Sequence, residues 1–434
     1  MKNVSILEYK SKVQNGIWTE AFRAAVADLN AAGGGYLTVP AGNYRTSSIE
    51  YCSDMTMELC EGAVLDFIND GLEHPVVMSR YEGVDRDVYM PLIFGRNLKN
   101  VKLCGKGRIE GNGPAWWEHR LDWPFPRPKS VVFQDSENIE IRDITITNSP
   151  CWTVVPLRSK NLLVDGITVI NPFESPNTDG CDPDSCQNVE IRNCTFDVGD
   201  DCIAVKSGTE YNKVFIPSEN IYVHNCRMMH GHCGVGIGSE MSGGVRNVRV
   251  EDCTFTDTER GLRLKTRRGR GGFVDGVSLT RVKMKNVLVP FVINMRYFCG
   301  PDGIAKCVAD TAPYPVSEKT PHVNNISLID FEAEETNAAA LYISGLSEAP
   351  IENVTLKNVS ISMAENATPG IPDAALEAPF MWKAGLILKF AKNLVMDNVK
   401  VKGVAGLTNL FSDCDGVFID GKEYNVRSLA PEDD

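Results

Sequence analysis

The stretch Asn188-Val189-Glu190-Ile191 starts with asparagine and continues with alternating apolar residues, and this phrase returns along the chain. It recurs at 100–103, 138–141, 161–164, 220–223, 247–250, 325–328, 353–356 and 393–396, with a glycine variant at 276–279. The central spacings are 23, 27, 32 and 27 residues. Periods of this length indicate a solenoid or propeller, and alternation with period two indicates strands. With no helical pattern between the strands, the sequence predicts an all-β fold, the coils of a parallel β-helix.

The repeated asparagines have a structural explanation. An amide at one fixed bend of each coil can bridge to the coils on both sides, as a ladder. Cysteines also recur at equivalent positions and are expected to stack inward as small apolar residues: Cys194, Cys226 and Cys253. A zinc site is the alternative, but the chain contains no Cys-x-x-Cys pair. A zinc site is therefore not expected.

A solenoid can exceed the usual domain length, so we expect one domain over residues 1–434. Its predicted parts are an N-terminal cap region (1–35), β-helix coils (36–425) and a tail (426–434). The cap is a predicted helix from Thr19 to Ala32. Thr19 is its expected N-cap residue, and the helix is expected to bury a stripe of Phe22, Ala25, Val26 and Leu29 before Gly33-Gly34-Gly35 ends it.

Composition sets further expectations. The apolar run in residues 1–10 is too short for a signal peptide, and no stretch is long enough to span a membrane. Together with 14 cysteines, this favours free thiols in a reducing, cytoplasmic setting. The formal net charge of −13 argues against nucleic acid as a partner. The oligomeric state is left open.

Carboxylates mark the candidate site. Asp200 and Asp201 stand side by side before the apolar run 202–205, and Asp179 precedes Gly180-Cys181 in a similar way one repeat earlier. Like charges repel, and ionised carboxylates are rarely buried without partners. Such a pair is unfavourable for folding and suits acid and base chemistry.

The asparagine ladder also predicts the register between coils. Asp200 follows Asn188 by twelve residues, and His232 follows Asn220 by twelve, so the two should occupy the same point on adjacent coils. Three further segments align by their apolar residues: 203–206, 235–238 and 262–265. The acids and His232 are therefore expected on one outward face, in a groove across the strands.

The same alignment turns Arg263 and Lys265 outward, into this groove. They begin a basic run without any acid, which continues with Arg267, Arg268 and Arg270. A solvated patch is the simpler interpretation. In an acidic protein, its convergence with the carboxylates favours a site for an anionic ligand.

These motifs in this order resemble glycoside hydrolase family 28, the polygalacturonases, which are right-handed, single-stranded parallel β-helices acting on pectin. The resemblance extends over most of the chain and is carried by 111–117, 127–129, 148–153, 175–179, 199–201, 231–232 and 263–265. One departure is Cys233, where the family usually has the second glycine of Gly-His-Gly.

The resemblance implies inverting hydrolysis of α-1,4-linked galacturonic acid without a cofactor or metal. Asp200 would protonate the glycosidic oxygen, Asp179 and Asp201 would hold and deprotonate the attacking water, and His232 would tune Asp200. Arg263 and Lys265 would bind the galacturonate carboxylate. Further expected substrate contacts are Asn177, Tyr297 and Arg127. An inverting enzyme needs its acid and base about 6.5–9.5 Å apart, a span that neighbouring coils offer.

Three alternatives stay open. One is a rhamnogalacturonan or xylogalacturonan hydrolase, another a pectate-lyase-like enzyme using calcium, and the third a non-catalytic carbohydrate-binding β-helix. The phrase 238–244 resembles exo-acting bacterial members, which predicts attack from the non-reducing end of oligogalacturonides. Segments containing Arg80, Glu82 and Arg127 are expected to wall off one end of the groove and hold the terminal sugar.

Overall fold

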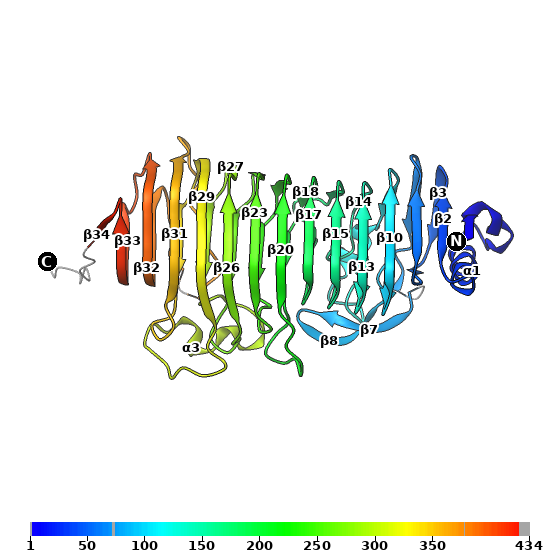
Figure 1. The fold of residues 1–434 in the computed structure, drawn as a ribbon, viewed down its shortest axis with the longest axis horizontal. Helices are drawn as coiled ribbons and strands as arrows, with labels where there is room; N and C mark the ends of the chain where they lie inside the picture. The colour runs from blue at the N-terminus through cyan, green and yellow to red at the C-terminus, as the bar shows by residue number, and fades with distance from the viewer. Residues whose placement is uncertain (1, 72–73, 377, 425–434) are drawn as a thin grey trace. The chain divides into compact units, whose positions relative to one another are not determined.

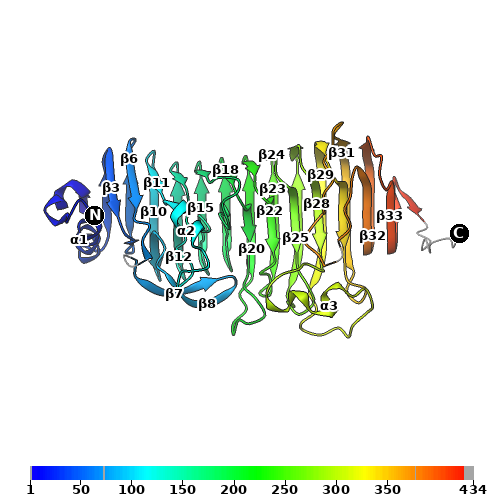
Figure 2. The ribbon, with the colours of Figure 1, turned by 180° about the vertical axis from the view of Figure 1, so that it is seen from behind.

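The computed structural model describes residues 2–71, 74–376 and 378–424, which leaves the predicted tail outside the described part. The chain divides into two compact units, Met1–Ala204 and Val205–Asp434, and each is described by itself; the single domain stays a prediction. Both consist of strands stacked in parallel coils with few helices (Figures 1 and 2). The predicted all-β fold is confirmed as a right-handed parallel β-helix with an N-terminal helix.

The first unit contains the N-terminal helices and the earlier coils. Its elements are β1 (Lys2–Ser5), η1 (Ile6–Lys12), α1 (Thr19–Ala31), β2 (Gly35–Val39), β3 (Gly42–Thr46), β4 (Ile49–Glu50), β5 (Met55–Leu59), β6 (Ala63–Phe67), β7 (Val76–Tyr81), β8 (Val84–Tyr89), β9 (Ile93–Arg96), β10 (Lys99–Gly105), β11 (Arg108–Glu110), α2 (Gly113–Glu118), β12 (Val131–Gln134), β13 (Glu137–Arg142), β14 (Thr145–Thr147), β15 (Lys160–Asp165), β16 (Thr168–Ile170), β17 (Gln187–Arg192), β18 (Thr195–Val198) and β19 (Asp201–Val205).

The second unit contains the later coils. Its elements are β20 (Ser218–His224), β21 (Arg227–His230), β22 (Cys233–Gly238), β23 (Val245–Glu251), β24 (Thr254–Thr256), β25 (Arg260–Lys265), β26 (Phe273–Thr280), β27 (Lys283–Lys285), β28 (Val289–Asn294), η3 (Pro301–Ile304), α3 (Lys306–Ala309), β29 (His322–Thr336), β30 (Ala339–Ser344), β31 (Ile351–Met363), β32 (Ala384–Lys402), β33 (Asn409–Ile419) and β34 (Lys422–Tyr424).

The asparagine ladder is present in both units. In the first unit the amide of Asn188 donates to Asn161 (3.1 Å), Asn161 to Asn138 (3.1 Å) and Asn138 to Asn100 (2.8 Å). These asparagines have positive φ, between 54° and 60°, a left-handed conformation that asparagine tolerates better than most residues. In the second unit Asn247 donates to Asn220 over 3.1 Å. Each asparagine side chain therefore links neighbouring coils, while its own backbone forms the bend of its coil.

The cysteines and the helical cap follow the sequence, except that Val26 of the predicted stripe is half-buried and Thr19 is not the N-cap residue. Cys194, Cys226 and Cys253 are buried, as expected of an inward stack. Helix α1 buries Phe22, Ala25 and Leu29, and Gly33 and Gly34, with φ of 77° and 107°, follow its end. The predicted cap at Thr19 is wrong. Trp18 is the N-cap residue, without a side-chain hydrogen bond, and the Thr19 hydroxyl instead accepts from the Ser47 amide (2.9 Å).

None of the helices in the described part of the chain has the length and apolar character that a bilayer crossing requires.

Candidate active site

In the first unit, one face of the coils is a parallel sheet, and the predicted acids lie next to its last members. Strands β4, β9 and β12 form this sheet, and bridges from Val131 to Val154, from Val154 to Cys181 and from Cys181 to Ile203 continue it. Since Cys181 is paired with Ile203, Asp179 and Asp201 occupy equivalent points two residues earlier. The predicted correspondence between these two acids is confirmed.

The three carboxylates come together. Asp179, Asp200 and Asp201 each contribute one oxygen, and these oxygens lie within 4.8 Å of one another. Asp179 and Asp201 are 3% and 1% exposed, and Asp200 is half-buried. The Asp201 amide donates to Asp200 Oδ1 (2.9 Å). The 4.8 Å joins one oxygen of each carboxylate and is not the separation between acid and base that distinguishes inverting enzymes. The same spacing also suits a hard cation such as Ca²⁺.

A network of small polar residues, which sequence reasoning missed, holds the turns that carry these acids. The Thr178 and Ser175 hydroxyls lie 2.5 Å apart, and the Gly199 amide donates to Thr178 Oγ1 (3.3 Å). Asn171 Nδ2 donates to the Thr178 carbonyl (3.3 Å). A Cβ at Gly199 would lie 2.4 Å from the Ser175 carbonyl oxygen, so only glycine fits directly before Asp200.

Two predicted substrate contacts, Arg127 and Asn177, bind each other. Arg127 is 3% exposed and donates to the carbonyls of Pro150 (2.7 Å) and Pro176 (3.0 Å) and to Asn177 Oδ1 (2.8 Å). Asn177 has a positive φ of 56° and is half-buried. Arg127 therefore supports the turn that leads to Asp179, and contact of either residue with substrate stays a prediction.

The hairpin of β7 and β8 covers part of the same face (Figure 2). The Tyr81 ring stacks on Trp152 at 5.5 Å. Other residues of and near the hairpin pack on an apolar cluster of Phe94, Val132, Cys151, Trp152 and Val155. Arg80 is buried and donates to Asp184 (2.8 Å) and Ser185 (2.9 Å), so its guanidinium anchors the hairpin. Glu82, at the hairpin turn, is exposed.

In the second unit the predicted register is confirmed between β22 and β25. Gly236 pairs with Arg263 and Gly238 with Lys265, as the alignment of 235–238 with 262–265 requires. His232 lies just before β22 and is half-buried.

The two basic residues of β25 meet an aromatic ring. Arg263 Cζ lies 5.2 Å from the ring centroid of Tyr297, and Lys265 Nζ lies 5.7 Å from it. Arg263 Nη2 also donates to the Tyr297 hydroxyl (3.2 Å). Tyr297 is half-buried, whereas the cations are 4% and 8% exposed. Sequence alone left Tyr297 as a weak candidate, and the structure groups it with the two predicted carboxylate-binding residues.

The rest of the basic run is not a free anion-binding patch, which corrects the prediction made from its charge. Arg267 and Arg270 share Glu210; the Arg267 bond measures 2.7 Å. Arg268 is bound by both carboxylate oxygens of Glu348, at 2.6 and 2.8 Å. All three arginines are buried. Partners from distant loops therefore neutralise these charges.

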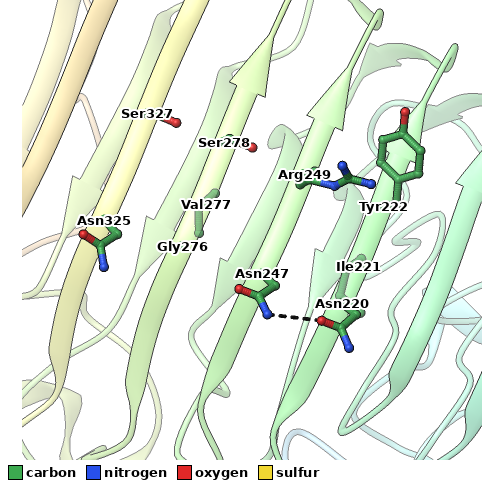
Figure 3. A pocket seen from close by; sticks show the side chains of 10 residues that line it. All are labelled: Asn220, Ile221, Tyr222, Asn247, Arg249, Gly276, Val277, Ser278, Asn325 and Ser327. Carbon is green, nitrogen blue, oxygen red and sulfur yellow. Dashed lines mark hydrogen bonds between the residues drawn. The ribbon is translucent and has the colours of Figure 1, made fainter.

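A hollow elsewhere on the second unit has a different origin. Figure 3 shows it on the faces of β20, β23, β26 and β29, with a volume of about 460 Å³. Gly276 stands there where other coils carry an asparagine, so the ladder is interrupted beside Asn247. The Tyr222 ring stacks on the His224 ring, with 4.3 Å between their centroids, and Arg249 Cζ lies 4.3 Å from the Tyr222 centroid. The ring therefore already has two partners. No acid lines the hollow, and we place no chemistry there.

The fold and the clustered carboxylates together define a β-helical glycoside hydrolase. The model of "Glycosyl hydrolases family 28" matches residues 78–373, and the chain belongs to this family. It is 36% identical to a "Probable polygalacturonase" of Vitis vinifera over 80% of this chain and 72% of that protein. It is 28% identical to a "Polygalacturonase" of Juniperus ashei over 61% of this chain and 51% of that protein.

Among solved structures, the chain is similar to a hyperthermoactive exopolygalacturonase from Thermotoga maritima. The TM-score is 0.75 and the identity 27%, and the match covers 91% of each chain. The predicted membership of the polygalacturonase family is therefore confirmed.

These relatives contradict one prediction. A cytoplasmic protein was expected from the short apolar start and the free thiols, but plant polygalacturonases are typically secreted. The free thiols do not restore the expectation, because Cys194, Cys226 and Cys253 are buried in the core and buried thiols of this kind do not indicate the compartment.

Proposed function

We propose that this family 28 hydrolase cleaves α-1,4-linked galacturonides of pectin by inversion and acts from the non-reducing chain end. The observation that carries the chemistry is the group of Asp179, Asp200 and Asp201, whose oxygens lie within 4.8 Å of one another. The family resemblance assigns the sugar carboxylate to Arg263 and Lys265. In a protein of net charge −13, an anionic sugar needs such cationic hydrogen-bond donors, even though Arg263 also pairs with Asp373.

In the proposed reaction, Asp200 gives its proton to the glycosidic oxygen as the bond from that oxygen to C1 breaks. A water held by Asp179 and Asp201 attacks C1 from the opposite side and gives a proton to one of these carboxylates. His232 assists Asp200 in its role as the acid, as the family resemblance implies. Arg263 and Lys265 bind the carboxylate of the sugar, and Tyr297 packs beside both cations.

Two segments support attack at a chain end. In the first unit, the β7–β8 hairpin lies on the apolar cluster around Trp152. In the second, Met381 packs on the cluster of Val289, Val292, Ala338, Ala339, Tyr342, Ala384 and Ile387, on β28, β30 and β32. The Thermotoga maritima relative, named an exopolygalacturonase, adds to this support.

The product profile on long polygalacturonate tests this mode of attack. We expect galacturonic acid as the only early product, together with a slow loss of viscosity, because only a chain end enters. A ladder of mid-sized oligomers at low conversion would show an open groove and an endo enzyme.

One alternative has an observation in its favour. Three carboxylate oxygens at this spacing could ligate Ca²⁺, which a pectate-lyase-like reaction uses. A chelator distinguishes the two, because only the lyase loses its activity. Rhamnogalacturonan and xylogalacturonan are tested as substrates in the same assay.

A further inference from the structure

A strap lies across the strands that carry the predicted substrate cations. We define it as residues 370–381; residue 377 is not described. Its ends pair with each other, since the Gly370 amide donates to the Met381 carbonyl (3.0 Å) and the Met381 amide to the Gly370 carbonyl (2.9 Å). Its middle accepts two bonds from Arg260 of β25, at the carbonyls of residues 371 (3.1 Å) and 372 (2.9 Å).

The strap continues alongside the segment that carries Tyr297. The Phe298 amide donates to the Ala374 carbonyl (3.0 Å), and Ala375 forms an antiparallel bridge with Tyr297. Backbone bonds on both sides of residue 373 therefore fix the position of this residue relative to β25 and Tyr297.

Among the described residues of the strap, Asp373 is the one acid, and it is 0% exposed. Its Oδ1 accepts from Nε (2.9 Å) and Nη2 (2.7 Å) of Arg263, and its Oδ2 accepts from Asn294 Nδ2 (3.0 Å). An arginine side chain has several rotatable bonds, and two bonds to one carboxylate oxygen hold its planar guanidinium in a single orientation. In that orientation the guanidinium also reaches the Tyr297 hydroxyl.

We propose that Asp373 is a positioning residue for substrate, which holds Arg263 in the orientation that binds the sugar carboxylate beside Tyr297. The inference rests on the proposed function and adds the strap to the substrate site. The Asp373 carboxylate also offsets the charge of Arg263. Arg263 therefore contributes directed hydrogen bonds to the sugar carboxylate more than net positive charge.

Kinetics of Asp373 variants on trigalacturonate test the proposal. Asp373→Asn should lower kcat/KM about 10–100-fold, mainly through KM, because a misplaced binding group weakens substrate alignment. In an Arg263→Ala background, the same change should alter kcat/KM less than about twofold, since coupled residues are not additive. Glu348→Gln is the control: it breaks another bidentate carboxylate–arginine pair, with side chains 5% and 7% exposed, and should keep kcat/KM within about threefold.

Asp373→Glu covers the case in which Asp373→Asn does not fold. It keeps the charge and moves the carboxylate by one methylene, so kcat/KM should fall about tenfold. The added methylene at a fully buried position should also lower Tm, without preventing folding. Wild-type kinetics in Asp373→Glu, or full additivity of Asp373→Asn with Arg263→Ala, would overturn the positioning role while leaving the hydrolase intact. A wild-type protein that turns over no galacturonide would overturn both.

Discussion

Replacing Asp200 by asparagine should lower kcat on oligogalacturonides by at least about 10²–10⁴-fold, the contribution typical of general acid catalysis. The amide has nearly the same shape but no proton to give to the glycosidic oxygen. Asp200 is half-buried and lies within 4.8 Å of the oxygens of Asp179 and Asp201. Asparagine is neutral, as the protonated acid is, and of nearly the same size, so Tm should stay close to that of the wild type.

The measurement is kcat and Tm on the same preparation. The matched control is Asp415→Asn, an exposed aspartate on β33 that should keep wild-type kcat. Activity of Asp200→Asn within about tenfold of wild type would contradict its role as the acid, because the expected loss is larger.

Lys265→Ala should lower kcat/KM on galacturonides by about 10–100-fold. Hydrogen bonds to charged groups contribute about 1.5–3 kcal/mol, and about 1.4 kcal/mol corresponds to a factor of ten. Lys265 is 8% exposed and lies beside the Tyr297 ring, where water screens its charge less than at the surface.

Lys283→Ala is the control for Lys265, since this lysine of β27 is exposed and pairs with Glu332 at 3.8 Å. It should leave kcat/KM unchanged. Equal values for Lys265→Ala and wild type would mean that the lysine takes no part in binding the sugar carboxylate.

The features that repeat along the chain could be predicted. Alternation with period two marked the strands, and the asparagine ladder set the register that pairs Gly236 with Arg263 and Gly238 with Lys265. The same reasoning placed Asp179 and Asp201 at equivalent points of neighbouring coils. Each coil repeats the same packing, so one coil predicts the next.

Contacts that loops bring from far along the chain could not be predicted. Asp373 binds Arg263 across 110 residues of sequence, and Glu348 binds Arg268 across 80. These loops have no period, so the basic run 263–270 looked like an anion-binding patch until its partners were placed. The Thr19 cap failed for a similar reason, because its hydroxyl is taken by Ser47, 28 residues away.

The central claim, that the clustered aspartates hydrolyse galacturonides with inversion, is tested most directly by proton NMR of trigalacturonate cleavage as it proceeds. The account predicts saturated galacturonic acid released first in the β-anomeric form, at a rate that a chelator does not change. An unsaturated product whose formation stops with the chelator, or a first product in the α-anomeric form, would contradict it.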